Sequence, residues 1–296
     1  MQTVHKRLPL WLRRSLPVIS AEKTHEILGK YKLNTVCESA LCPNRSECYS
    51  RNTATFMILG DVCTRSCGFC AIAAGKPLQV EQDEPQRVAK AAAALGLEYV
   101  VITSVARDEM EDEGAGHFAR TVQAVKNEIP GVSIEVLTPD FHGRRELIQT
   151  VVDAGPTVYN HNMESVERLQ KKVRPQASYD RTLQVIETIK DLNPSMTTKS
   201  GLMLGLGETL DEVRKTARDL HSSGCDILTL GQYLSPGKGH LECEAFISPE
   251  TFQQLGEELK GFGFQAVFSG PYVRSSYHAG ETFLTSQSAE RRAQSE

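Results

Sequence analysis

The stretch Cys63-Thr-Arg-Ser-Cys67-Gly-Phe-Cys70 places three cysteines in a C-x3-C-x2-C pattern directly after the apolar run 56–59. Such a short apolar run is typical of a buried strand. Thiolate is a ligand that iron–sulfur clusters select, and a cubane 4Fe-4S cluster has four iron corners. Three cysteines on one loop can hold three corners and leave the fourth iron open. The stretch therefore predicts a cluster whose open iron binds a substrate.

Two other uses of cysteine fit this stretch less well. Structural zinc takes four ligands from paired motifs, and only Cys67 and Cys70 have the x2 spacing of such a motif. A zinc site stays open as an alternative on spacing alone. A framework of disulfides is less suited to this chain, because 296 residues can bury a full core without cross-links.

A second cysteine triple lies upstream, in Cys37-Glu-Ser-Ala-Leu-Cys42-Pro-Asn-Arg-Ser-Glu-Cys48. Two three-cysteine sites imply two clusters, each with an open iron or a fourth ligand from elsewhere. The intervening residues are polar and turn-prone, so we expect a loop that is held by metal and loses order without it. Cys225 and Cys243 lack partners at ligand spacing and are predicted to be buried thiols that pack as small hydrophobic groups.

Composition argues against several other classes of protein. Lysine and arginine number 33 and the acidic residues 37, so the chain lacks the excess of positive charge that is typical of proteins that bind nucleic acid. No apolar run approaches the roughly 20 residues that span a bilayer. Cysteine motifs without a secretory signal favour the reducing cytoplasm. Residues 1–20 are basic and weakly imitate a transit peptide, but Pro9 and Pro17 favour an arm packed on the main domain.

From residue 55 onward, short apolar segments alternate with amphipathic ones, which predicts a parallel sheet covered by helices. Six or seven such units are too few for a complete eightfold barrel. The predicted strands are 55–59, 99–103, 133–137, 157–160, 198–204, 226–231 and 265–269. The predicted helices are 21–28, 86–95, 117–128, 144–154, 179–192, 210–222 and 249–260.

The C-x3-C-x2-C motif after a first strand resembles the radical S-adenosylmethionine (SAM) superfamily. Its combination with an upstream C-x4-C-x5-C motif resembles the lipoyl synthase family, and segments 134–141, 159–164 and 274–277 extend the likeness along nearly the whole chain. The resemblance implies an α/β fold, an incomplete (β/α)6 barrel over residues 53–285. Residues 1–52 would form an extension that carries an auxiliary cluster, and 286–296 a disordered tail. The active site is expected at the carboxyl ends of the strands.

The same resemblance implies the ligands of two 4Fe-4S clusters. The radical cluster would be held by Cys63, Cys67 and Cys70, and the auxiliary cluster by Cys37, Cys42, Cys48 and a serine of Arg274-Ser275-Ser276-Tyr277. Ser276 is our first choice for this fourth ligand and Ser275 the second. Serine oxygen is a harder ligand than thiolate, so that iron corner should be easily displaced.

Contacts to SAM are expected at the ends of several strands. Hydroxyl groups there suit an ammonium group, asparagine suits ribose hydroxyls and carboxylates, and arginine suits the SAM carboxylate. His161 lies between two asparagines and is interpreted as structural. Residues 109–115 depart from the family pattern, so contacts from that loop are not predicted. The SAM-binding candidates are Phe69, Thr103, Ser104, Asn160, Asn162, Glu164, Arg174, Lys199 and Gly205.

By resemblance, the reaction is the insertion of two sulfur atoms into an octanoyl chain bound to a lysine, with two SAM molecules used per product. The expected partners are octanoylated lipoyl carrier domains of 2-oxo acid dehydrogenase complexes, the glycine cleavage H protein, and a reductant such as ferredoxin or flavodoxin. The basic run Lys171, Lys172 and Arg174 would steer an acidic carrier. The alternative is a radical SAM enzyme whose second cluster only relays electrons. No nucleic acid or membrane partner is expected.

Overall fold

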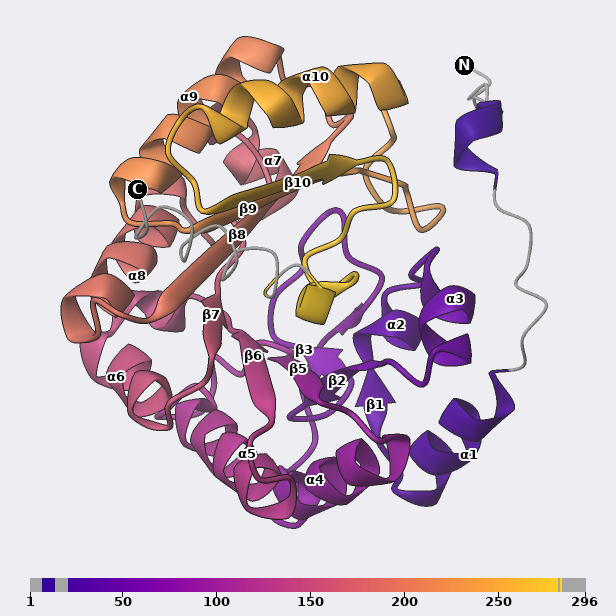
Figure 1. The fold of residues 1–296 in the computed structure, drawn as a ribbon, viewed down its shortest axis with the longest axis vertical. Coiled ribbons are helices and arrows are strands. Elements are labelled where there is room, and N and C mark those ends of the chain that lie inside the picture. Colours follow the sequence, from indigo (N-terminus) through magenta and orange to yellow (C-terminus); the bar gives the residue numbers. More distant parts are fainter. Residues whose placement is uncertain (1–6, 14–20, 282, 284–296) are drawn as a thin grey trace.

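In a computed structural model, which describes residues 7–13, 21–281 and 283, parallel strands stand side by side in a curved sheet (Figure 1). Each parallel strand pairs with the next parallel strand along the chain, as in a barrel that does not close. Their bounds are Thr55–Ile58 (β2), Tyr99–Ser104 (β5), Ser133–Leu137 (β6), Val158–Asn160 (β7), Thr197–Leu204 (β8), Ile227–Gln232 (β9) and Ala266–Gly270 (β10). Every predicted strand is confirmed, with ends that shift by no more than a residue.

Helices cover the outer face of this sheet and connect its strands (Figure 1). Three of them begin and end at the predicted residues. In each of these three, a side chain caps the first turn; Thr209 and Glu212, for example, form a reciprocal capping box. A short helix, α7 (Gln170–Val173), was not predicted. The long helices are Glu84–Leu95 (α4), Ala115–Glu128 (α5), Arg145–Asp153 (α6), Tyr179–Leu192 (α8), Leu210–Ser222 (α9) and Pro249–Lys260 (α10).

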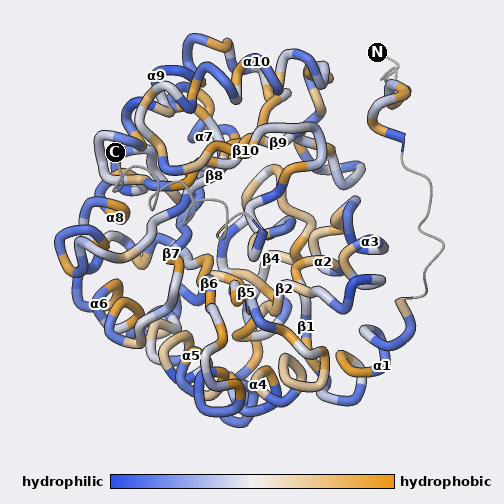
Figure 2. The backbone as a smooth tube through the Cα atoms, viewed as in Figure 1, coloured by the Kyte–Doolittle hydropathy of each residue, from blue (hydrophilic) through white to orange (hydrophobic). Residues whose placement is uncertain are grey.

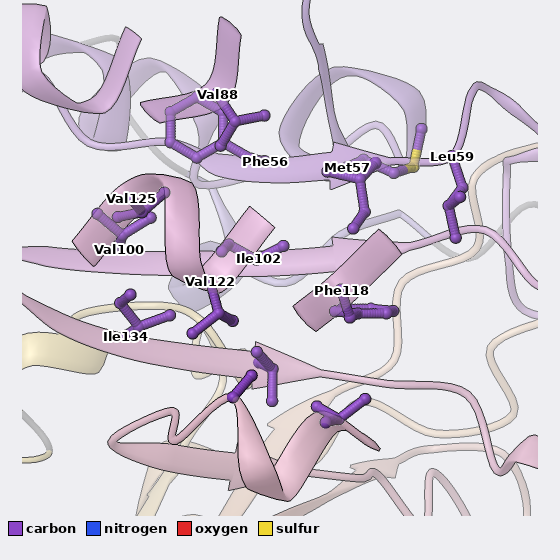
Figure 3. Close-up of a cluster of buried hydrophobic side chains, with 14 of the residues drawn as sticks. Phe56, Met57, Leu59, Val88, Val100, Ile102, Phe118, Val122, Val125 and Ile134 are labelled. Atoms are coloured by element: carbon purple, nitrogen blue, oxygen red, sulfur yellow. The ribbon is translucent and has the colours of Figure 1, made fainter. Parts of the chain in front are cut away.

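The hydrophobic core lies between the sheet and the helices. Phe56, Ile102 and Ile134 of three neighbouring strands pack against Val88 of α4 and Phe118 of α5 (Figure 3). Figure 2 shows hydrophobic residues along the strands and hydrophilic residues around the outer rim of helices. Alternate strand residues point to the inner face, and several of these are polar yet buried: Thr103, Glu135, Asn160, Lys199 and Thr229. The apolar outer face of the sheet packs against the helices, and the inner face carries polar side chains that could bind a ligand.

The N-terminal extension joins this sheet and its core. It comprises Glu22–Lys30 (α1), Asn34–Thr35 (β1), Val36–Ser39 (α2) and Arg45–Ser50 (α3), and β1 pairs antiparallel with β2. The prediction of a loop at 37–48 is confirmed for residues 40–44 and wrong for the rest, which belongs to the helices α2 and α3. Tyr49 explains the difference: its side chain is buried in the same cluster as the barrel core and its hydroxyl lies 2.7 Å from that of Thr35.

The segment after β10 crosses the inner face of the sheet and reaches α3 (Figure 1, yellow). Two glycines on the inner face leave room for this segment. A Cβ on Gly231 would lie 2.1 Å from the carbonyl oxygen of Val273, and one on Gly201 would lie 3.0 Å from Ser275 Oγ. Asn44 then donates to the carbonyl of Tyr272 at 2.8 Å. The end of the barrel is thereby fastened to the N-terminal extension.

Two predictions for the chain ends fall wholly or largely outside the described residues. The tail 286–296 is outside them, as is most of the basic arm 1–20. Among the helices that the structure describes, none has the length and apolar character needed to cross a membrane.

Candidate active site

The loop that carries Cys63, Cys67 and Cys70 lies at the carboxyl ends of the strands, as predicted. It is flanked by two short paired strands, Val62–Cys63 (β3) and Ala73–Ala74 (β4). The amide of Gly68 donates to the carbonyl of Val173, and its own carbonyl accepts from the amide of Leu241, both at 2.9 Å. A Cβ at Gly68 would lie 3.0 Å from the Leu241 side chain, so a glycine fits this close approach. The loop is therefore fixed between α7 and the segment after β9.

The three thiols of this loop form one group. Burial and the neighbouring Cys70 thiol raise the pKa of Cys67 to about 12, and the guanidinium of Arg174 opposes this rise. Burial also raises the pKa of Cys70, with a smaller contribution from Cys63. Cys63 Sγ accepts hydrogen bonds from the amides of Arg65, at 3.4 Å, and Ala106, at 3.3 Å. A metal cluster would bind these groups as thiolates and displace their protons.

None of the eight cysteines, all of which lie in the described part of the chain, forms a disulfide. Cys225 is buried, and its thiol donates to the carbonyl of Ile227, as expected for a packing residue. Cys243 is only partly buried, so its predicted burial is wrong. It belongs to the irregular segment after β9.

Arg65 was missed in the sequence although it lies between two ligand positions. Its guanidinium is buried and binds Asp108 at 2.7 Å and Asp140 at 2.8 Å. Burial alone would raise the pKa of Asp140, but Arg65 and other cationic neighbours lower it to about 2. The two carboxylates follow β5 and β6, so Arg65 ties the cysteine loop to the ends of both strands. An arginine between the cysteines with acidic residues after two strands is a signal that could have found it.

Four of the predicted SAM contacts converge beside the cysteine loop. Ser104 Oγ and Asn160 Oδ1 are buried without a hydrogen-bond partner among the described residues, so a polar ligand would satisfy them. Asn162 donates to Glu164 at 3.0 Å and accepts from the hydroxyl of Ser275 at 2.9 Å. Glu164 has a backbone φ of 62°, and its carboxylate contributes to the raised pKa of Cys67, so it lies near the cysteine loop. This set fits a ligand with amino, hydroxyl and carboxylate groups.

The other SAM candidates make contacts within the protein. Arg174 uses four of its N–H donors on Gln170, Asn162 and Thr182. Lys199 lies deeper on the inner face, where its ammonium is 3.0 Å from both oxygens of Glu135. The remaining three have structural contacts: Thr103 donates to the carbonyl of Leu137, Gly205 approaches Gln232 closely, and Phe69 packs against the second core cluster.

The upstream triple lies around the two short helices of the extension. Cys37 is on α2, and burial raises its pKa to about 11 although hydrogen bonds from Thr55 oppose the rise. The amide of Cys42 donates to the carbonyl of Cys37 at 3.1 Å, and Cys48 is on α3. Ser276 and Cys48 line the same cavity of about 360 Å³, whereas Ser275 is bonded to Asn162. The two serines therefore face different parts of the site.

His161 is structural rather than ligating. It is fully enclosed, with Nδ1 2.9 Å from the carbonyl of Thr138 and Nε2 3.3 Å from the hydroxyl of Thr182. Burial, with Arg174 nearby, lowers its pKa to about 4 from the ordinary value of 6.5.

This shift predicts a loss of stability in acid. Between pH 6.5 and 4 the unfolded chain binds the proton and the folded chain does not, so the free energy of unfolding falls as the pH is lowered. The contribution of His161 should drop by about 2 kcal/mol from pH 7 to pH 5. Denaturant titrations of the native protein and of His161→Gln measure it. Equal pH slopes for the two proteins would show that His161 is not responsible.

Comparison with known proteins agrees with this geometry. Residues 57–220 match the family model of the radical SAM superfamily. Lipoyl synthase 2 of Gloeobacter violaceus is 52% identical over 95% of this chain and 97% of that protein. Lipoyl synthase of Caldanaerobacter subterraneus subsp. tengcongensis is 50% identical over 92% of this chain and 96% of that protein. The chain belongs to the lipoyl synthase family.

Solved structures confirm the fold expected of the family. SuiB of Streptococcus suis bound to its precursor peptide SuiA superposes with a TM-score of 0.57, over 77% of this chain and 52% of that chain at 11% identity. Methylornithine synthase (PylB) gives a TM-score of 0.51, over 77% and 68% at 16% identity. These likenesses concern the barrel alone.

Membership of the family makes this protein a radical SAM enzyme that uses a 4Fe-4S cluster and SAM. Membership of this family favours an iron–sulfur cluster over the zinc site that the cysteine spacing alone left open. The donor set fits such a cluster: three thiols on one loop that affect one another's ionisation, one of which accepts two backbone hydrogen bonds.

Proposed function

We propose that this protein is a lipoyl synthase that inserts sulfur at carbons six and eight of an octanoyl chain amide-linked to a lysine of a carrier protein. The observation that carries the proposal is the position of the C-terminal segment, which binds Asn162, the partner of Glu164, and lines a cavity with Cys48 of the upstream triple. Ser275 is bonded to Asn162 on the side of Cys67, and Ser276 lines a cavity with Cys48. Sulfur insertion requires that the sulfur donor and the radical source reach the same substrate. The C-terminal segment borders the residues proposed for both.

The proposal assigns each triple a cluster. Cys63, Cys67 and Cys70 hold the radical cluster with SAM on its open iron, and the upstream triple with Ser276 holds the auxiliary cluster that donates sulfur. Residues 1–52 act as the cluster-bearing extension of a barrel over 53–285. Two unactivated C–H bonds must be broken, so each product requires two molecules of SAM.

The protein itself orients and shields the reactants. When bound, the cofactors supply a carbon radical that removes hydrogen from the chain, together with the sulfur that replaces it. Ser104 and Asn160 offer unpaired buried acceptors or donors to SAM, and Glu164 offers a carboxylate. Arg65 holds the cysteine loop on the strand ends. The buried inner face of the sheet excludes water from the radical.

The carrier and the reductant are part of the same proposal. Octanoylated domains of 2-oxo acid dehydrogenase complexes and the glycine cleavage H protein would be the substrates, and ferredoxin or flavodoxin the electron source, in the reducing cytoplasm. Lys171 and Lys172 are on α7, which contacts the cysteine loop through Val173. Lys172 is half-exposed and pairs with Glu244 at 2.8 Å. Basic side chains at this rim suit an acidic carrier.

Isotope-resolved mass spectrometry tests the proposal. The protein is reconstituted with iron and heavy sulfide, then incubated anaerobically with SAM, dithionite and an octanoyl-lysine peptide in light sulfide. We expect the peptide to gain two heavy sulfur atoms, in an amount limited to one peptide per protein. Cleavage of SAM without sulfur gain would leave a radical SAM enzyme and end the lipoyl assignment. Light sulfur in the product would assign the second cluster to electron relay.

A further inference from the structure

One carboxylate, that of Glu47, fastens the C-terminal segment to α3. The hydroxyl of Tyr277 donates to this carboxylate and lies 3.0 Å from each of its oxygens. The imidazole of His278 is 3.4 Å away, and Arg51, the residue directly after α3, is 3.5 Å away. The Glu47 side chain is about three-quarters buried, with 27% of its surface exposed. A carboxylate that accepts a phenolic hydrogen bond makes a stronger contact than a neutral acceptor does.

The contact between Glu47 and Tyr277 lies next to two of the proposed cluster ligands in the sequence. Glu47 immediately precedes Cys48, and Tyr277 immediately follows Ser276. The bond therefore joins the neighbours of two proposed ligands of the auxiliary cluster, across 230 residues of sequence. Glu47, Cys48 and Ser276 also line one cavity.

We propose that Glu47 is a positioning residue that holds the segment Arg274–Tyr277, and with it Ser276, at the auxiliary cluster. The inference rests on the proposed function, because it concerns that cluster. Under the proposed function, Ser276 would be released when the auxiliary cluster supplies sulfur, so a bond to iron would not keep the segment in place throughout the reaction. The contact between Glu47 and Tyr277 involves no iron and persists when the serine is released.

The test isolates the auxiliary cluster and examines its iron sites. In a full-length background with Cys63, Cys67 and Cys70 replaced by alanine, a cluster enriched in iron-57 is studied by Mössbauer spectroscopy. Ser276→Ala and Ser275→Ala provide the signatures of a lost serine ligand. We expect Glu47→Ala and Tyr277→Phe to shift the iron site toward the Ser276→Ala signature. The ratio of serine-bound to free iron should fall roughly ten- to a hundredfold, as for one hydrogen bond to a charged group.

Further variants separate positioning from general damage. Glu47→Gln keeps an acceptor oxygen and should restore much of the native signature. The double variant of Glu47→Ala and Tyr277→Phe should resemble either single variant, because both remove the same bond. Glu38→Ala is the matched control: this half-exposed carboxylate follows Cys37 and pairs with His25. Its iron signature should stay native.

Two results would overturn the inference. A native iron signature in Glu47→Ala, together with a changed one in Ser276→Ala, rejects the role of Glu47 and leaves the proposed function intact. A background protein that holds no cluster on Cys37, Cys42 and Cys48 rejects both.

Discussion

Replacement of Cys63, Cys67 or Cys70 with alanine is expected to abolish cleavage of SAM, whereas replacement of Cys37 or Cys42 leaves cleavage intact and abolishes sulfur insertion. The two triples occupy separate elements, the loop after β2 and the helices of the extension. Loss of one ligand from a three-thiol site should reduce activity by more than the roughly 10- to 100-fold that loss of an outer partner of a metal costs.

Chromatography of 5′-deoxyadenosine measures the first reaction, and mass spectrometry of the peptide measures the second. Cys225→Ala is the matched control, because this thiol is buried among core residues of the other hydrophobic cluster. It should retain both reactions. The assignment of separate roles fails if a Cys37→Ala protein with a full radical cluster no longer cleaves SAM.

Replacement of Lys199 with methionine is expected to destabilise the protein by about 3–5 kcal/mol, the usual cost of leaving a buried charge without its partner. Glu135 is fully buried, and Lys199 is the only lysine or arginine within salt-bridge distance of it in the described structure. Tyr99 and Asn160 also donate to its oxygens, at 2.8 Å and 2.9 Å. Anaerobic denaturant titrations measure the loss.

Neutralising both partners provides the control for this prediction. A protein with Lys199→Met and Glu135→Gln should regain most of the lost stability, because no charge is then buried alone. A Lys199→Met protein that keeps its stability but binds SAM weakly would return Lys199 to the SAM-binding residues predicted from the sequence.

Much of the fold could be predicted because it depends on local patterns. Apolar runs separated by amphipathic segments located every parallel strand of the large sheet, and capping residues such as Thr209 define where helices begin. The helices α2 and α3 escaped prediction, because their stability comes from burial of Tyr49 against distant residues. Local polarity alone favoured a loop there.

The residues of the candidate site also differ in whether local sequence patterns could identify them. The cysteines were evident from spacing, and Ser104, Asn160, Asn162 and Glu164 from their places after strands. Arg174 and Lys199 were placed in the site by residue type, but their partners come from elements that no local pattern brings together. Arg65 has the same origin, since its carboxylates lie 43 and 75 residues away in sequence.

The passage of the C-terminal segment across the inner face has a consequence for biosynthesis. Domains form from the N-terminus as the ribosome delivers the chain. Both cysteine triples are therefore made long before Tyr277, which is separated from Glu47 by 230 residues. Until β10 has been made, nothing from this segment covers Cys48, so the proposed auxiliary cluster, if delivered to the nascent chain, would meet three thiols with the fourth side open. The proposed function thus implies an order of maturation, in which the cluster binds first and Ser276 reaches it afterwards.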